Sequence, residues 1–276
     1  MREGKNLMDF LLIFVAGIAI GSFLNVCIYR VPRRVSVVSP SSHCPSCKKP
    51  IRPTDNIPLI SFLILRGRCR DCGARIEWRY PVVELCSGLL FLVCYLKFGF
   101  SFELFFYYAF SCALVVITFI DRELRIIPDR ISIPFMMIGL VGSVFPGLES
   151  PTLPGSADAA FYVRLLSSIL GIVVGGGSLT LAGYLYVKAT GVEGMGGGDV
   201  KLVAMIGAFL GWKAVLAVIF LASLAGSALG IVLILIFRMS RRTPIPFGSF
   251  LAPAGILVLF YWSSIVEWYL TNVRLG

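Results

Sequence analysis

Charge and histidine are both scarce in this sequence. Only 14% of its 276 residues are Asp, Glu, Lys or Arg, whereas 57% are hydrophobic. Charged residues make up about a quarter of an average soluble domain, so the composition excludes an ordinary soluble fold. The single histidine, His43, adjoins Cys44. It could replace a metal ligand there, but we expect a solvated loop residue, and the chain offers no Ser–His or Cys–His constellation for covalent catalysis.

Nucleotide-binding and nucleic-acid-binding motifs are missing as well. The glycine-rich run Gly194–Lys201 ends in Asp-Val-Lys rather than in the GK[ST] of a phosphate-binding loop. The net charge of +10 is not accompanied by a motif that enters a nucleic-acid groove, so we expect no nucleic-acid partner. In a membrane protein such a charge reflects orientation and contact with anionic lipid, and we expect membrane lipid as a partner.

Long apolar segments are the main feature of the sequence. They predict an all-α polytopic membrane protein with about eight transmembrane helices, because about 20 apolar residues cross a bilayer. The first apolar segment shows no pattern typical of signal-peptide cleavage. The segment at 202–211 is too short to span alone. The eight segments are Leu7–Tyr29, Val82–Phe98, Phe102–Ile120, Ile131–Phe145, Val163–Val187, Leu202–Gly211, Ala214–Phe237 and Phe250–Leu270.

One large polar block, Arg30–Arg79, separates the first two apolar segments. It carries eleven Lys and Arg against three acidic residues, so it is expected in the cytoplasm. With eight spans, the N-terminus then lies outside, and the inside segments hold 19 of the 25 basic residues. We therefore expect three parts: a first transmembrane helix (1–29), a cytoplasmic loop domain (30–80) and a membrane domain (81–276). This topology places Asp121 and Asp199 on the same cytoplasmic face.

The polar block contains four cysteines as two CxxC pairs, Cys44/Cys47 and Cys69/Cys72. This spacing is typical of a four-thiolate zinc site, which would be structural because it leaves no open position. The alternative is structural cysteine, reduced or disulfide-bonded, although a cytoplasmic location disfavours disulfides. Four further cysteines lie in apolar segments, where packing is the expected role: Cys27, Cys86, Cys94 and Cys112.

Two aspartates stand at the ends of apolar segments. Asp199 follows Gly196–Gly198 and precedes Lys201, and Asp121 ends the third segment. A carboxylate at a membrane boundary is costly and is therefore a functional candidate. Two carboxylates that share one proton can activate water and protonate a leaving amine, which predicts acid–base chemistry on a peptide. Glycines such as Gly196 and Gly198 would let another backbone approach.

Simpler roles exist for individual aspartates. Asp121 could form an interfacial ion pair with Arg122 or Arg125. Asp129 follows Pro128 at the start of an apolar segment, so we expect its carboxylate to cap that helix.

Several motifs occur in the order seen in one known family. They are GSFLNVCIYRVP at 21–32, DNIP at 55–58 and RYPVVE at 79–84 around the CxxC pairs, IPD at 127–129, GMGGGDVKL at 194–202 and PFG at 246–248. Together they resemble the type IV prepilin peptidases, membrane aspartyl proteases with a GxGD motif, in their long bifunctional bacterial form. The resemblance extends over nearly the whole chain.

The resemblance implies two activities in the bacterial inner membrane. The first is cleavage of the basic leader of type IV prepilins and type II secretion pseudopilins at the cytoplasmic face, with Asp121 and Asp199 as the catalytic pair. The second is N-methylation of the new N-terminal residue with S-adenosylmethionine, which accompanies the cysteine loop. We expect the substrate's apolar N-terminal helix, lying in the bilayer, to supply most of the affinity.

The methyl-donor site has no sequence signature of its own. No GxGxxG follows a strand, so a donor pocket would have to be assembled from the cysteine loop and nearby helix ends. The candidates there are Glu84, Arg66 and Arg68, with Asp55, Asn56 and Lys201 as further polar residues near that surface. The alternatives to the bifunctional enzyme are a peptidase without methyltransferase activity, a non-catalytic zinc-ribbon membrane adaptor, and a proton-coupled transporter.

Overall fold

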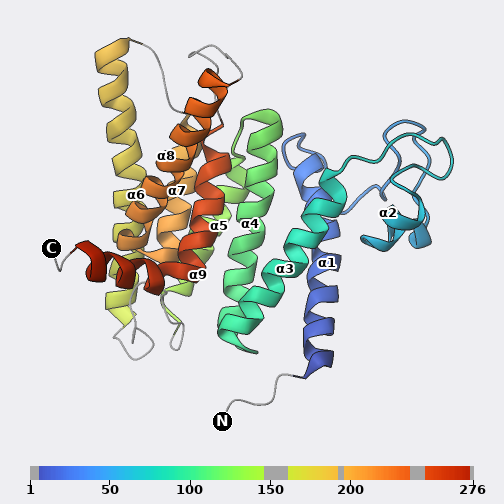
Figure 1. Cartoon of the computed structure of the whole chain (residues 1–276), viewed down its shortest axis with the longest axis horizontal. Helices are drawn as coiled ribbons and strands as arrows, with labels where there is room; N and C mark the ends of the chain where they lie inside the picture. The colour runs from blue at the N-terminus through green and yellow to red at the C-terminus, as the bar shows by residue number, and fades with distance from the viewer. Residues whose placement is uncertain (1–5, 146–160, 192–195, 237–245, 274–276) are drawn as a thin grey trace. The chain divides into compact units, whose positions relative to one another are not determined.

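A computed structural model describes residues 6–145, 161–191, 196–236 and 246–273. Within these ranges the chain is helical, and its only β-type pairings are two isolated bridges in the loop after the first helix. The chain forms two compact units, Met1–Val116 and Ile117–Gly276. Figure 1 shows the helices of both units along the chain.

The first unit is built on two packed helices, α1 (Leu7–Arg30) and α3 (Arg79–Phe98). Gly17 and Gly21 allow the close approach, because a Cβ on Gly21 would lie 2.7 Å from the Cα of Glu84. The polar block between the helices contains one 3₁₀ turn, η1 (Pro53–Asn56), and a short helix, α2 (Ile60–Ile64). The helix α4 (Phe102–Leu124) begins in this unit and ends in the next.

The second unit surrounds a short central helix, α7 (Gly197–Leu210). Every side chain from Leu202 to Leu210 is buried, as expected for a helix that is hydrophobic on all sides. The helices α5 (Asp129–Gly142) and α6 (Phe161–Thr190) pack against it, as do α8 (Trp212–Leu235) and α9 (Gly248–Val273). A carboxylate at the start of α7 is therefore held inside a helical bundle.

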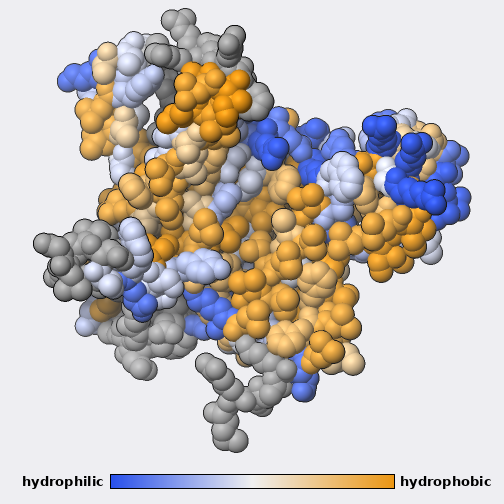
Figure 2. Space-filling model, in the orientation of Figure 1, coloured by the Kyte–Doolittle hydropathy of each residue, from blue (hydrophilic) through white to orange (hydrophobic). Residues whose placement is uncertain are grey.

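Each of the eight predicted apolar segments forms a helix, which confirms the all-α membrane fold. Six of these helices are long and apolar enough to cross a membrane, namely α1, α3, α4, α6, α8 and α9. The other two, α5 and α7, have 14 residues each. The count of eight spans and the boundaries at 30 and 81 stay predictions. Figure 2 shows hydrophobic residues along α1 and α3 and hydrophilic ones over the loop around α2.

Candidate functional site

Asp121 lies at the C-terminal end of α4 and is almost completely buried, at 4% exposure. Its Oδ2 atom accepts two hydrogen bonds from Ser249, one from the backbone N–H at 2.6 Å and one from the hydroxyl at 2.9 Å. Ser249 is the second residue of α9, so the positive end of that helix dipole faces the carboxylate. This contact offsets the unfavourable position of an acid at the end of its own helix. Among the described residues no direct ion pair joins Asp121 to Arg122 or Arg125, although the positive charge of Arg125 acts on the carboxylate.

Asp199 is the third residue of α7 and is half-buried. Burial and, secondarily, the negative charge of Asp121 raise the pKa of Asp199 to about 6. The two predicted aspartates therefore interact electrostatically, although 78 positions separate them in the sequence.

Ile127 connects the surroundings of the two acids. A Cβ on Gly198, next to Asp199, would lie 3.0 Å from the Ile127 Cβ atom. A Cβ on Gly248 would lie 2.8 Å from the Ile127 Cδ1 atom and 3.0 Å from Oδ2 of Asp121. The segment after α4 thus packs between the starts of α7 and α9, and a larger residue at Gly198 or Gly248 would require Ile127 to shift.

The other described glycines of the motif face open space. A Cβ on Gly196 or Gly197 would meet no atom of the described residues within 4 Å. The glycine-rich run thus has two parts: Gly198 accommodates Ile127, whereas Gly196 and Gly197 leave a free approach to the start of α7. Gly194 and Met195 lie outside the described residues.

Lys201 binds Asp129 rather than either buried acid. Its Nζ atom lies 2.7 and 2.8 Å from the two carboxylate oxygens of Asp129. The expected capping role of Asp129 is wrong: Pro128 is the N-cap of α5, and the helix has no side-chain cap. The ion pair links α5 to α7 at an exposed position, where such pairs are worth roughly 1 kcal/mol or less.

The four cysteines of the polar block come together in the first unit. The sulfur atoms of Cys44, Cys47, Cys69 and Cys72 all lie within 4.8 Å of one another, and those of Cys44 and Cys72 are 3.8 Å apart. Tetrahedral zinc with Zn–S bonds of about 2.3 Å places its sulfurs about 3.8 Å apart. The cluster therefore has the composition and the spacing of a four-thiolate metal site.

The two cysteine pairs have the same local fold. In the first, the N–H of Cys44 donates to the Lys49 carbonyl at 2.9 Å, and Lys48 adopts a positive φ of 61°. In the second, the N–H of Cys69 donates to the Ala74 carbonyl at 2.8 Å, and Gly73 has φ of 70°. Backbone hydrogen bonding from Cys47 lowers the pKa of the Cys44 thiol to about 6, whereas, despite a backbone hydrogen bond from Ala74, burial and hydrogen bonds from the other three thiols raise the pKa of Cys72 to about 11, so the four thiols ionise unequally.

Beside this cluster, Glu84 and the polar loop enclose a cavity. Glu84 is 6% exposed, and its Oε2 atom accepts a hydrogen bond from the Leu59 N–H at 2.8 Å. Asp55 also lines the cavity and is held by a two-pronged ion pair with Arg70. The charge and hydrogen bonds of Arg70 hold the pKa of Asp55 below its usual range.

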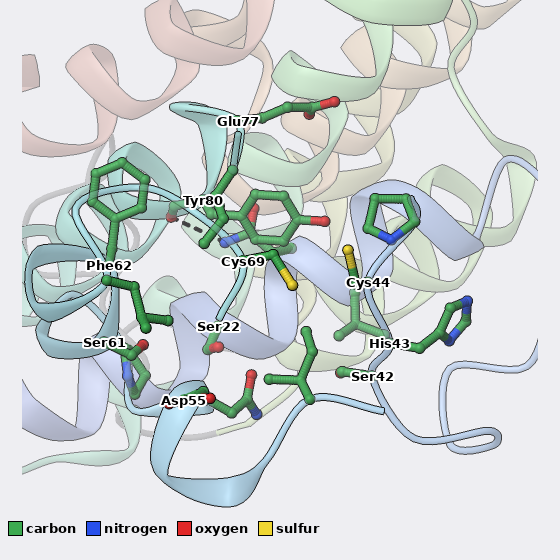
Figure 3. A pocket seen from close by; sticks show the side chains of 18 of the residues that line it. Ser22, Ser42, His43, Cys44, Asp55, Ser61, Phe62, Cys69, Glu77 and Tyr80 are labelled. Carbon is green, nitrogen blue, oxygen red and sulfur yellow. Dashed lines mark hydrogen bonds between the residues drawn. The ribbon is translucent and has the colours of Figure 1, made fainter. Parts of the chain in front are cut away.

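Figure 3 shows the side chains of Ser22, Asp55, Phe62 and Tyr80 around this cavity. Asn56 lines it too. Of the three donor-site candidates, only Glu84 does, whereas Arg66 and Arg68 are not among the lining residues.

Sequence reasoning missed three contributors to these sites. Ser249 directly follows the PFG motif, and Ile127 precedes Pro128 in the IPD motif. The motifs therefore indicated that both regions belong to the family pattern, but they did not indicate which residues Ser249 and Ile127 contact. Asn25, in the first-helix motif, gave no signal beyond being a polar residue within an apolar segment.

Fold and sites together define a multi-pass membrane protein with interacting acids in a helical bundle and a four-cysteine loop. Family models specify the class further. Residues 108–231 match the type IV leader peptidase family, and residues 15–98 match the bacterial peptidase A24 N-terminal domain. The chain belongs to the type IV leader peptidase family.

Curated relatives cover nearly the whole chain. A prepilin leader peptidase/N-methyltransferase of Aeromonas salmonicida is 36% identical over 298 residues, which cover 99% of this chain and 98% of the relative. A protein of the same name from Pseudomonas aeruginosa is 34% identical, with 92% of this chain and 91% of the relative covered. Another from Bacillus subtilis is also 34% identical, with coverages of 94% and 97%. No solved structure matches the chain.

Proposed function

We propose that this protein cleaves the leader peptide of type IV prepilins and related pseudopilins and then N-methylates the new N-terminal residue. The observation that carries the peptidase assignment is the meeting of Asp121 and Asp199 around Ile127, with Ser249 bonded to Asp121. Both activities appear in the names of relatives that match almost the full length of the chain.

The surroundings of the two acids suggest different roles for them. Ser249 donates two hydrogen bonds to Asp121, which stabilise its ionised form. Asp199 has a pKa of about 6 and retains its proton more readily. Pairs of acids whose environments differ in this way divide into a base and an acid. We therefore assign Asp121 as the general base and Asp199 as the general acid.

Hydrolysis then proceeds without a covalent enzyme intermediate. Asp121 takes a proton from water, whose oxygen bonds to the scissile carbonyl carbon. Asp199 donates a hydrogen bond to the carbonyl oxygen and later a proton to the leaving nitrogen as the C–N bond breaks. Gly196 and Gly197 give an extended substrate backbone room to approach the start of α7. Lys201 supports the site by binding Asp129 and holding α7 beside α5.

The cysteine cluster would hold a structural zinc ion. Cys44, Cys47, Cys69 and Cys72 supply four sulfur ligands at suitable separations, which leaves no coordination position for a substrate. The ion would fold a loop that has little hydrophobic core of its own. S-adenosylmethionine would supply the methyl group for the pilin amine, and Glu84, which lines the cavity beside the cysteine cluster, would help to hold it.

The charge distribution supports a location in the inner membrane with the acids on the cytoplasmic side. The basic loop between α1 and α3 would then be cytoplasmic and the N-terminus outside. Substrates would be recognised largely through an apolar N-terminal helix that lies in the bilayer against the enzyme and its surrounding lipid.

The central test compares three aspartate variants. Asp121→Asn and Asp199→Asn should each abolish cleavage of a full-length prepilin and leave the metal content unchanged. Asp129→Asn is the matched control and should retain cleavage, because the exposed ion pair that it weakens, with Lys201, stabilises the contact between α5 and α7 by only roughly 1 kcal/mol or less. Cleavage retained in either of the first two variants would refute the catalytic pair. The product mass after incubation with S-adenosylmethionine tests the second activity in the same assay.

A further inference from the structure

The cavity beside the cysteine cluster has a volume of about 640 Å³, within the range of about 300–1,000 Å³ that is usual for small-molecule sites. It is enclosed by α1, the start of α3 and the polar loop, all of which belong to the first unit. Aromatic side chains contribute to its walls, including Phe62 and Tyr80 (Figure 3). The cavity is distinct from the paired acids, which belong to the second unit.

Asn25 contributes a buried hydrogen-bond acceptor that has no partner. This residue of α1 lines the cavity and is 2% exposed. Its amide nitrogen donates to the carbonyls of Tyr80 at 3.1 Å and Gly21 at 3.4 Å, which fixes the orientation of the amide. Its Oδ1 atom makes no hydrogen bond among the described residues. Buried polar atoms are nearly always paired, so this oxygen indicates a ligand with a donor group.

Glu84 places a second acceptor in the same cavity. The residue is buried on α3, one turn beyond Tyr80. An ionised carboxylate has about four acceptor positions, of which the Leu59 N–H and the Ser22 hydroxyl fill two. Leu59 has a positive φ of 58°, an unusual conformation for a β-carbon-bearing residue, and the bond to Glu84 holds it there. Acceptor groups from α1 and α3 thus line one space together. Its walls also carry six basic side chains, namely Arg30, Lys49, Arg52, Arg70, Arg75 and Arg79.

These features suit a zwitterionic ligand that has hydrogen-bond donors for the acceptors, an anionic group for the basic side chains, and an aromatic ring. S-adenosylmethionine has a sulfonium, an ammonium and a carboxylate group, two ribose hydroxyls, an amino group and a purine. We propose that this cavity is the methyl-donor site, in which Glu84 and Asn25 accept hydrogen bonds from S-adenosylmethionine and Phe62 and Tyr80 flank its purine. The assignment rests on the proposed methyltransferase function.

Other occupants fit the cavity less well. A lipid phosphate would pair with the basic side chains of the lining, but it offers no donor to the Glu84 carboxylate or to the Asn25 amide oxygen, whereas S-adenosylmethionine supplies both kinds of group. The amine of a processed pilin would satisfy one acceptor, but it would be followed by an apolar helix rather than by a compact polar group. Binding of the pilin amine in this cavity would give a different result in the experiment below, namely a raised KM for the pilin.

The test measures equilibrium binding of radiolabelled S-adenosylmethionine to the purified full chain with its metal. Glu84→Gln keeps an oxygen for the Leu59 N–H but removes the charge, and Asn25→Ala removes the orphan acceptor. Each should weaken binding by about tenfold or more, since hydrogen bonds to charged or buried groups have effects of this order. The matched control is Glu103→Gln, which also removes a helix carboxylate from the first unit but lies outside the cavity. It should bind within about twofold of the native chain.

The possible outcomes distinguish a failure of the proposed donor site from a failure of the proposed methyltransferase activity. Native binding and methylation together with unchanged affinity in both cavity variants would place the donor elsewhere and overturn the assignment. A raised KM for the pilin at unchanged donor affinity would identify the cavity as the amine site and also overturn it. If the native chain cleaved its substrate but neither bound the donor nor methylated the product, the proposed methyltransferase function itself would be contradicted.

Photolabelling of the native chain provides a test that does not depend on variants. Irradiation with radiolabelled S-adenosylmethionine should attach the label near Tyr80 or Phe62, as determined by mass spectrometry of the peptides. Label confined to the second unit would contradict the proposal. Monodisperse elution and unchanged bound metal report whether Glu84→Gln and Asn25→Ala are folded.

Discussion

Four glycines along one helix provide a graded test of the packing that positions Asp199. Gly171, Gly175, Gly176 and Gly177 lie in α6, which packs against α7. A Cβ on Gly171 would overlap the backbone carbonyl of Gly207. A Cβ on Gly175 would lie 2.9 Å from the Val203 carbonyl oxygen, closer than real contacts allow. A Cβ on Gly176 would make an ordinary contact at 3.5 Å, and one on Gly177 would meet no atom within 4 Å.

The same substitution at each position isolates the cost of overpacking. Alanine gains about 0.8–1 kcal/mol of helix propensity over glycine, and this gain is common to all four sites. Overpacking costs about 1–3 kcal/mol, occasionally more, where a neighbour cannot move. Relative to Gly177→Ala, we therefore expect Gly175→Ala to be less stable by about 1–3 kcal/mol. Gly171→Ala should be the least stable, because its Cβ would overlap a backbone carbonyl more deeply than the Cβ of Gly175→Ala would, and neither carbonyl can rotate away.

Thermal unfolding of the purified protein in detergent measures the series. A change of 1 kcal/mol shifts Tm by about 2–4 °C in a chain of roughly this size, so Gly175→Ala should melt about 2–12 °C below Gly177→Ala. Prepilin cleavage should fall in the same order, because Val203 and Gly207 belong to the helix that carries Asp199 in its first turn. The reasoning is refuted if Gly177→Ala melts as low as Gly171→Ala.

Three further predictions concern the two sites. Because the pKa of Asp199 is raised to about 6, the proton on the acid is lost above that pH, and the cleavage rate should fall about tenfold per pH unit beyond it; a flat rate profile up to pH 8.5 would contradict the assignment. Ser249→Ala removes one of two donors to Asp121, worth about 1.5–3 kcal/mol, and should slow cleavage about ten- to a hundredfold. Ser249→Thr, which keeps the hydroxyl, should restore most of the rate, and failure of this rescue would argue against the hydrogen bond. Metal chelation or Cys72→Ser should make the loop between α1 and α3 sensitive to protease, as seen by mass spectrometry, and unchanged resistance would mean that the metal does not hold the loop.

Composition and local pattern predicted the elements of the fold well. The apolar segment predicted at 7–29 is α1, and the one at 102–120 is the first part of α4, which continues to Leu124. These predictions succeeded because membrane helices satisfy their backbone hydrogen bonds within one segment, so that a local window contains the information. The convergence of the four cysteines was predictable for the same reason, since each CxxC pair folds as a short local turn.

Contacts between distant segments could not be predicted in this way. Asp121 and Ser249 are 128 positions apart, and Lys201 and Asp129 are 72 apart. No sequence window contains either pair. Asp129 was interpreted as a helix cap because its ion-pair partner, Lys201, is distant in the sequence. The pairing of Asp121 with Asp199 was nevertheless anticipated, because counting spans places both acids at one membrane face without any knowledge of side-chain packing.

The length of α7 has a consequence for the supply of water. A helix of 14 residues is about 21 Å long, whereas the hydrocarbon core of a bilayer is about 30 Å thick. Such a helix cannot reach both membrane surfaces, so at least one of its ends lies below the level of the surrounding headgroups. Hydration there depends on a gap among neighbouring helices or on a local thinning of the bilayer. For an acid on the first turn of α7, the thickness of the host membrane then becomes a variable that controls the rate of hydrolysis.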